Sequence, residues 1–229
     1  MPPPPPSYYT SLESKLASTS AELETLHLDA ALDYSMDSSN PSSVPNCLSP
    51  FVPSPSSVCA SIPPLLSSFN LPPPYTFLDL GCGDGRVCIS LSLSLPQTKC
   101  LGIDVSPLCV SQASANALSE GRLKSSCEFL EADVVGMGGE LDYTLYGGWR
   151  EVKVVYMFIF PTLLEKVWPF LNALEGLEVL ITNTYHFEGG VEVQHGWRRV
   201  DVGGKGGGEE EEGGEFNNLV TYTRVCSDV

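Results

Sequence analysis

The stretch that decides the fold is Phe77-Leu78-Asp79-Leu80-Gly81-Cys82-Gly83-Asp84-Gly85-Arg86, a short apolar strand that runs directly into three alternating glycines. Glycine is needed where the backbone turns with a positive φ or approaches a ligand without a Cβ in the way. Residues 87–91 are mostly apolar and predict the start of a buried helix. A glycine-rich turn between a strand and a helix offers unpaired N–H groups and a positive dipole to an anionic ligand group. The stretch therefore predicts a nucleotide-binding turn.

The spacing of the glycines separates two classes of adenosine-containing cofactor. A dinucleotide fingerprint requires a glycine three residues after its second one, where the helix packs closely on the strand. Counted from Gly83, that position holds Arg86, which disfavours NAD. Asp79 precedes Gly81 by two residues, and a carboxylate facing the loop suits a cofactor with an ammonium or sulfonium group. For Asp84 two interpretations stay open: a turn or capping residue that begins the helix, or a cofactor contact.

Two further acids follow strand-like runs in the same half of the chain. One apolar run ends in Asp104, about 20 residues beyond the glycines, which is the separation at which an acid reaches ribose hydroxyls. The next run, from Cys127, leads to Asp133, and we expect Glu131 within it to face solvent. Three acids at successive strand ends beside a glycine loop rarely coincide by chance.

Together these residues resemble the class I S-adenosylmethionine-dependent methyltransferases, whose first motif is an acid followed by GxGxG. In that family the acid after the second strand binds the ribose hydroxyls, which carries over to Asp104. The acid after the third strand lies by the adenine amino group, which carries over to Asp133. The cofactor-binding residues that the resemblance implies are Asp79, Gly81, Cys82, Gly83, Gly85, Asp104 and Asp133. S-adenosyl-L-methionine is accordingly the expected cofactor.

The resemblance extends to a subgroup of small, stand-alone members that includes protein lysine methyltransferases. The segments that carry it are 51–54, 154–161 and 181–185, and the whole resemblance spans residues 50 to 225. It implies a lysine of a protein as the leading acceptor. The chain lacks the amino-terminal membrane-anchoring stretch of the mitochondrial enzymes of this kind.

Strands alternate with helical patterns along the core, which predicts an α/β fold with a parallel sheet and helices on both faces. The expected strands are 77–80, 100–104, 127–131, 154–158, 179–183, 197–202 and 219–225, and the expected helices are 58–69, 87–95, 107–123 and 161–174. No helical pattern separates the last two strands, so we expect them to form an antiparallel hairpin. A Rossmann-like seven-stranded sheet with this hairpin is also what the resemblance implies.

The chain divides by composition into a tail and one domain. Residues 1–45 form a proline-rich tail, in which leucines at helical spacing over 11–34 predict an amphipathic helix. This helix either packs on the outside of the core or caps the cofactor site. The resemblance implies that residues 46–229 form a methyltransferase domain. Within it, residues 203–215 contain only glycine, glutamate and one lysine and predict a surface loop, with attraction of a basic protein substrate as the alternative.

The composition predicts a cytoplasmic protein without a structural metal. The chain of 229 residues is 42% hydrophobic and contains no apolar run of 18 or more residues, so we expect no membrane span. Its start resembles neither a signal peptide nor a transit peptide, which predicts a cytoplasmic protein. The eight cysteines show no CxxC and no zinc-like spacing with histidine, so we expect buried thiols in a reducing compartment and no metal.

The charge disfavours nucleic acid as a partner. The chain has 12 lysines and arginines against 28 acids, a formal net charge of -16, whereas phosphate backbone contacts need clustered basic residues. Arg198 and Arg199 are the only adjacent basic pair, which is more typical of a strand that faces solvent.

The chemistry of methyl transfer requires few fixed groups. It is an in-line displacement, so catalysis depends on placing the acceptor close to the methyl carbon and excluding water. We therefore assign no catalytic residue, and we expect Phe160, Asn183 and Tyr185 to line the acceptor pocket, with packing on the sheet edge as the alternative for the last two. The chain lacks the Asn/Asp-Pro-Pro-Tyr signature of enzymes that methylate planar amides or adenine. A small-molecule methyltransferase, a non-catalytic S-adenosylmethionine-binding module and an NAD-dependent oxidoreductase stay open, and the sequence carries no mark of oligomeric state.

Overall fold

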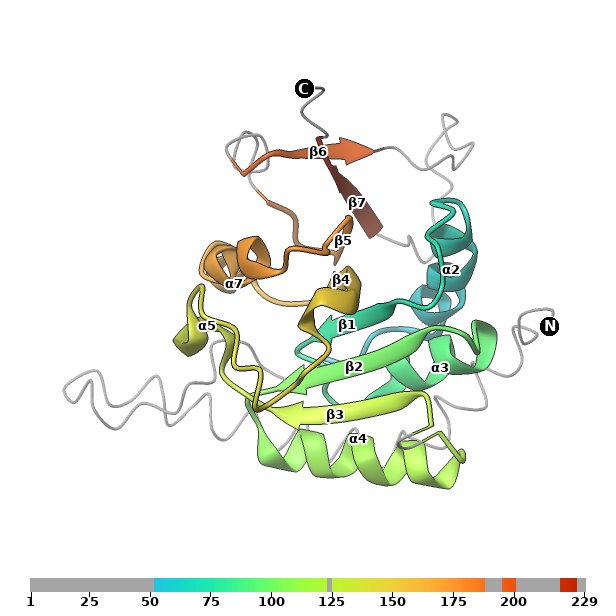
Figure 1. The fold of residues 1–229 in the computed structure, drawn as a ribbon. Helices are drawn as coiled ribbons and strands as arrows, with labels where there is room; N and C mark the ends of the chain where they lie inside the picture. The colour runs from blue at the N-terminus through green and yellow to red at the C-terminus, as the bar shows by residue number, and fades with distance from the viewer. Residues whose placement is uncertain (1–51, 123–124, 188–194, 201–218, 226–229) are drawn as a thin grey trace.

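The computed structural model describes residues 52–122, 125–187, 195–200 and 219–225 (Figure 1). The amphipathic helix expected over 11–34 and the acidic loop expected over 203–215 lie outside these residues. The division of the chain at residue 45 therefore stays a prediction.

Seven strands form one sheet in the order β3-β2-β1-β4-β5-β7-β6, which Figure 1 shows from bottom to top. Their bounds are β1 Thr76–Leu80, β2 Lys99–Asp104, β3 Cys127–Glu131, β4 Val152–Met157, β5 Val179–Asn183, β6 Trp197–Val200 and β7 Leu219–Arg224. Strands β1 to β5 pair in parallel, and β7 pairs antiparallel with both β5 and β6. The predicted seven-stranded sheet with its C-terminal hairpin is confirmed.

Helices cover both faces of the sheet, so its central strands are apolar along their length. Helices α2 Ser56–Ser67, α3 Arg86–Ser94 and α4 Pro107–Ser119 contribute to one hydrophobic cluster. Helices α5 Val134–Met137, α6 Pro161–Leu164 and α7 Trp168–Ala173, with the 3₁₀ turn Trp149–Glu151, belong to a second cluster. Every residue of β1 is buried, because this strand lies between the two clusters.

Two predicted helices are shorter than the sequence pattern indicates. The helix expected over 161–174 is two helices, α6 and α7, because Pro169 has no N–H to donate to the carbonyl of Glu165 and its ring would clash there. The helix expected over 107–123 ends at Ser119. Gly121 follows with φ +66, and the left-handed conformation closes the helix through the bond from Arg122 N to Ala117 O.

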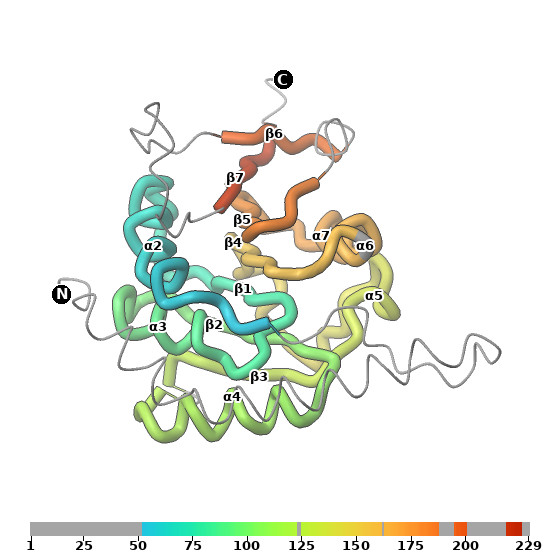
Figure 2. The backbone as a smooth tube through the Cα atoms, turned by 180° about the vertical axis from the view of Figure 1, so that it is seen from behind, coloured from blue at the N-terminus to red at the C-terminus, as the bar shows by residue number. Residues whose placement is uncertain are grey.

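The parallel strands bring the loops after β1 to β5 to one edge of the sheet. The irregular residues 52–55, which lead into α2, also reach this edge, and Figure 2 shows them passing beside the turn after β1. Within the described parts of the chain, no helix is long and apolar enough to cross a membrane.

Candidate functional site

The glycine-rich loop after β1 needs glycine at each of its three alternating positions. Gly81, Gly83 and Gly85 have φ values of 77, 52 and 78 degrees, which other L-residues adopt only at a cost. The N–H groups of Gly81 and Cys82 both donate to the carbonyl of Ile103, at 2.8 and 3.0 Å. The loop is therefore a tight turn anchored on β2.

The back of the loop packs against β3 and α4. A Cβ at Gly85 would lie 2.8 Å from the ring of Phe129 and 2.9 Å from the Cβ of Ala113. On the side towards β4, a Cβ at Gly81 would lie 3.2 Å from the side chain of Ile159. The loop is thus enclosed from behind, and only small residues fit.

Asp104 lies directly beside the loop, as its spacing predicts. One carboxylate oxygen, Oδ2, accepts a hydrogen bond from the N–H of Gly83 at 2.9 Å. The other, Oδ1, accepts from the N–H of Ser106 at 2.9 Å. These two bonds fix the carboxylate between the loop and the start of α4.

Asp133 caps the short helix α5 after β3. Its Oδ1 accepts from the N–H groups of Val135 and Gly136, both at 3.0 Å. A Cβ at Gly136 would come within 2.8 Å of the second oxygen, Oδ2, so glycine leaves that oxygen unobstructed. The neighbouring Glu131 is exposed, as expected.

Asp79 is a buried carboxyl group close to two other acids. Only 2% of its surface is exposed, and burial raises its pKa well above the usual range, with Asp104 and then Asp84 adding to the rise. A positive charge on a ligand at this point would favour the ionised form of Asp79, so the buried carboxyl suits a ligand of that kind.

Cys82 is a protonated thiol rather than a nucleophile. Burial raises its pKa well above that of a free thiol, and the nearby carboxylates, Asp104 first, raise it further. The six cysteines that the structure describes are all buried, and none of them is part of a disulfide. Among the described residues, no group of three or more potential ligands is arranged to hold a metal ion.

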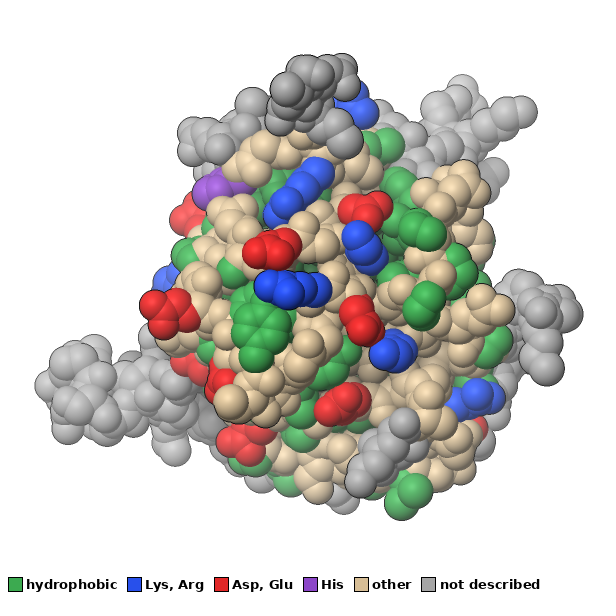
Figure 3. All heavy atoms as spheres, viewed as in Figure 1, with side chains coloured by type: hydrophobic (Ala, Val, Ile, Leu, Met, Phe, Trp, Pro, Cys, Tyr) green, Lys and Arg blue, Asp and Glu red, His purple; other side chains and the backbone are tan. Residues whose placement is uncertain are grey.

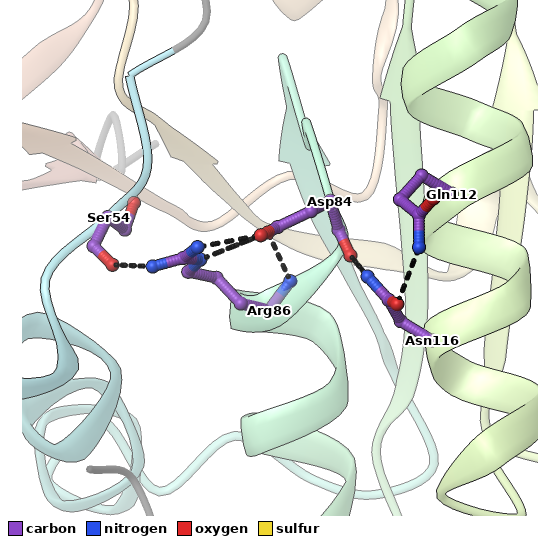
Figure 4. A network of polar contacts seen from close by, with 5 residues as sticks. All are labelled: Ser54, Asp84, Arg86, Gln112 and Asn116. Carbon is purple, nitrogen blue, oxygen red and sulfur yellow. Dashed lines mark hydrogen bonds and ion pairs between the residues drawn. The ribbon is translucent and has the colours of Figure 1, made fainter. Parts of the chain in front are cut away.

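Asp84 forms a buried ion pair with Arg86, which Figure 4 shows at the start of α3. The Nη2 group of Arg86 donates to Oδ2 of Asp84 at 2.7 Å, and Nε donates to Oδ1 at 3.0 Å. The N–H of Arg86 also donates to Oδ1 at 3.2 Å, so Asp84 stabilises the turn before α3, while Gly85 is the N-cap residue of the helix. The ion pair itself was missed, although the unusual arginine in the glycine motif is a signal for it.

A second polar group joins residues 52–55 to the sheet. The hydroxyl of Tyr156, on β4, lies 2.9 Å from Oγ of Ser54, and Nδ2 of Asn183 donates to the same hydroxyl at 3.2 Å. Burial raises the pKa of Tyr156, which keeps the hydroxyl protonated. The sequence interpretation placed Asn183 near the acceptor. It gave no role to Ser54 or Tyr156, although both lie in segments that carry the resemblance, because their contact joins positions 102 residues apart.

The predicted acceptor residues lie together where β4 and β5 end. The rings of Phe160 and Tyr185 make an edge contact with centroids 5.2 Å apart, and Phe158 stacks on Tyr185 at 6.3 Å. Thr184 has φ 63, so the chain turns sharply between Asn183 and Tyr185. The structure therefore shows the packed arrangement that was the alternative for Tyr185, near the carboxyl ends of β4 and β5.

Several basic side chains lie beside acidic ones on the face that Figure 3 shows. Lys153 and Glu178 are 2.7 Å apart, and Lys99 and Glu151 are 2.9 Å apart. Arg198 and Arg199 are exposed on β6, as predicted. Isolated pairs of this kind do not form the continuous basic surface that binds nucleic acid.

A family model described as a methyltransferase domain matches residues 77–145. The chain carries a methyltransferase domain. The matched part begins in β1 and includes the glycine loop, Asp104 and Asp133. A search of curated proteins found no match to the sequence.

Solved structures share the fold of this methyltransferase domain at low sequence identity. An RNA methyltransferase from Salinibacter ruber, in complex with S-adenosyl-L-homocysteine, is 21% identical with a TM-score of 0.52, covering 78% of this chain and 96% of its own. Magnesium protoporphyrin IX methyltransferase from Synechocystis PCC 6803, with bound S-adenosylhomocysteine, is 14% identical with a TM-score of 0.52, covering 91% of this chain and 98% of its own. The two proteins act on unrelated acceptors, so the shared fold does not identify one.

Proposed function

We propose that this protein transfers the methyl group of S-adenosylmethionine to the side-chain amine of a lysine in another protein. The lysine ammonium would first lose its proton to solvent, the neutral amine would form the new carbon–nitrogen bond as the carbon–sulfur bond breaks, and S-adenosylhomocysteine would leave. The observation that carries the donor assignment is the hydrogen bond from Gly83 to Asp104, which brings the glycine loop and the second-strand acid into one site. When bound, S-adenosylmethionine would supply an activated methyl group on a positively charged sulfur. The site's small loop residues and acids suit that group.

The residues proposed to hold the donor divide by chemistry. Asp104 would accept hydrogen bonds from ribose hydroxyls, and Oδ2 of Asp133 would accept from the adenine amine. Gly81, Gly83 and Gly85 would let the backbone approach the donor, with Cys82 contributing only its main chain and packing. Asp79 would favour the positive charge, because it lies buried at the end of β1 with Asp104 and Asp84 near it.

Two features support a lysine acceptor over a nucleic acid. The net charge of -16 attracts a basic protein and repels a phosphate backbone. Phe158, Phe160 and Tyr185 place aromatic rings at the carboxyl ends of β4 and β5, and ring faces attract an ammonium group. The amide of Asn183 lies at the same edge. A cytoplasmic site of action remains part of the proposal.

The alternative functions differ in what they require of the same residues. A small-molecule methyltransferase would use the same donor site and differ only in its acceptor. A non-catalytic module would bind the donor with its acceptor position closed by the aromatic rings. An oxidoreductase is the weakest alternative, because the buried side chain of Arg86 occupies the position of the glycine that NAD binding requires.

The test is transfer of radiolabelled methyl groups from S-adenosylmethionine to a cell lysate. We expect label in protein that survives nuclease treatment and disappears when lysines are blocked by acetylation beforehand. Label found only in the small-molecule fraction would indicate a small-molecule acceptor instead of lysine. Label that nuclease removes would indicate that the acceptor is RNA. Tight donor binding without any transfer would indicate the non-catalytic module.

A further inference from the structure

Ser54 is held from two sides by side chains that are themselves buried. Its carbonyl accepts a hydrogen bond from Nη1 of Arg86 at 3.3 Å, and its hydroxyl bonds to that of Tyr156 at 2.9 Å. Ser54 is 7% exposed although it lies in an irregular segment, residues 52–55. Pro53 and Pro55 have no N–H groups, so this segment has few backbone donors of its own and depends on side chains to hold it.

The arginine on one side belongs to a rigid group of contacts, shown in Figure 4. Arg86 is 5% exposed and paired with Asp84, and the side chain of Asn116 on α4 donates to the Asp84 carbonyl at 2.9 Å. Gln112 in turn donates to Asn116 at 2.8 Å. Removing a charged pair from water is costly, so an ion pair in this place points to a geometric requirement.

The tyrosine on the other side lies between the two halves of the proposed active site. Tyr156 is the direct neighbour of Asp79 in the pairing of β4 with β1. Its hydroxyl also accepts from Asn183 at the end of β5, among the residues proposed for the acceptor. Ser54 is therefore bonded at once to the glycine-loop side and to the acceptor side of the sheet edge.

We propose that residues 52–55 form a wall of the methyl-donor site, and that Arg86 and Tyr156 are positioning residues that hold this wall. The inference rests on the proposed donor site. The wall would exclude water beside the glycine loop and keep a fixed distance between donor and acceptor. Neither positioning residue needs to touch the donor.

The first test is hydrogen exchange of the full chain with and without S-adenosylmethionine. We expect exchange to slow both in peptides from the glycine loop and in peptides that cover 52–60. If exchange slows only in peptides from the glycine loop, residues 52–55 do not form a wall of the donor site. If calorimetry detects no binding of S-adenosylmethionine to the wild type, the proposed function fails and this inference fails with it.

The second test compares two tyrosine variants that each lose one hydroxyl. Tyr156→Phe removes the bond to Ser54, and we expect the Kd for S-adenosylmethionine to rise about tenfold, the effect of one hydrogen bond. Tyr146→Phe is the matched control, because its hydroxyl bonds to Thr76 at 3.2 Å, at the opposite end of β1. The control should bind the donor like the wild type. The Kd values are measured well below the unfolding temperatures of all three proteins. If both variants then bind the donor with the same Kd as the wild type, Tyr156 contributes to stability alone.

Arg86→Lys tests the other side of the wall. Lysine retains the charge opposite Asp84 but cannot reach both that carboxylate and the Ser54 carbonyl. We expect a folded protein with a Kd for S-adenosylmethionine raised about tenfold, and with exchange in 52–60 no longer slowed by the donor. Wild-type affinity in this variant would overturn the role of Arg86.

Discussion

Asp104 is the residue on which the donor site depends most directly, and its replacement should weaken binding of S-adenosylmethionine. We expect Asp104→Ala to cost about 1 to 3 kcal/mol, the scale of leaving buried donors without a charged acceptor. Titration calorimetry measures this. Asp142→Ala is the control, because Asp142 likewise accepts backbone N–H bonds, from Thr144 and Leu145, but on an exposed turn. Unchanged affinity in a folded Asp104→Ala protein would contradict the ribose assignment.

The carboxyl group of Asp79 should strengthen the binding of S-adenosylmethionine and lower the stability of the folded protein. Its pKa is raised in the folded protein, so its contribution to stability is full below the unfolded value near 3.8 and is lost as the pH rises through the folded pKa. We therefore expect Asp79→Asn to unfold at a higher temperature than the wild type at pH 8, with the difference shrinking towards pH 4. The same variant should bind S-adenosylmethionine more weakly, and binding of S-adenosylhomocysteine, which lacks the sulfonium charge, should weaken less. A variant with lower stability at pH 8 would show that the ionised carboxylate is stabilised by its surroundings.

The residues recovered from the sequence are those whose role is local. Gly81 and Asp79 could be placed because a positive φ and a strand end are properties of a few consecutive residues. Ser54 and Tyr156 could not, since 102 positions separate them and the bond between them depends on how β4 and the residues before α2 meet. The buried pair of Asp84 and Arg86 was also missed. The two residues are close in sequence, but the groups that bond to them lie on other elements.

At the scale of the element, the turn after β1 depends on both its conformation and its packing. Gly85→Ala should lower the free energy of unfolding by about 2 to 4 kcal/mol, because left-handed alanine is strained and its Cβ would meet Phe129 at 2.8 Å. Gly121→Ala is the control, with φ +66 and nothing within 4 Å of its Cβ. It should cost only about 1 to 2 kcal/mol. Denaturant unfolding compares the two, and equal losses would mean that packing behind the loop contributes nothing.

Helix lengths show where an apolar pattern misleads. Residues 161–174 have a continuous apolar spacing, yet the chain forms α6 and α7 because backbone hydrogen bonding fails at Pro169. The proline that breaks the helix was visible in the sequence. The end of α4 at Ser119 is likewise explained by a nearby residue, since Gly121 takes the left-handed conformation that stops a helix.

Over the whole molecule, the sheet was predictable because alternating strands and helices permit few arrangements. The two-sided burial of β1, β2, β4 and β5 and the hairpin of β6 and β7 both follow from apolar runs and their spacing. Which helices share a face, and which side chains meet at the carboxyl edge, depends on tertiary packing and could not be predicted from the sequence. The acceptor is not encoded in the fold, since relatives of this shape act on RNA and on a porphyrin.

The acidity of the molecule should make recognition of a basic acceptor depend on salt. With a net charge of -16, attraction to a lysine-rich peptide is screened over about 10 Å at 0.1 M salt. We expect KM for such a peptide to rise with ionic strength while the Kd for S-adenosylmethionine changes little. A peptide with the same acceptor lysine and serines in place of the flanking basic residues is the control. If KM for the basic peptide is independent of salt, the net charge has no part in acceptor choice.

The central claim is that the glycine loop and its acids bind S-adenosylmethionine and not a dinucleotide. Parallel calorimetric titrations of the full chain with S-adenosylmethionine, S-adenosylhomocysteine and NAD test it most directly. We expect saturable one-to-one binding of the two sulfur compounds and no heat of binding with NAD. Binding of NAD alone would contradict the account, and so would failure of both sulfur compounds to bind.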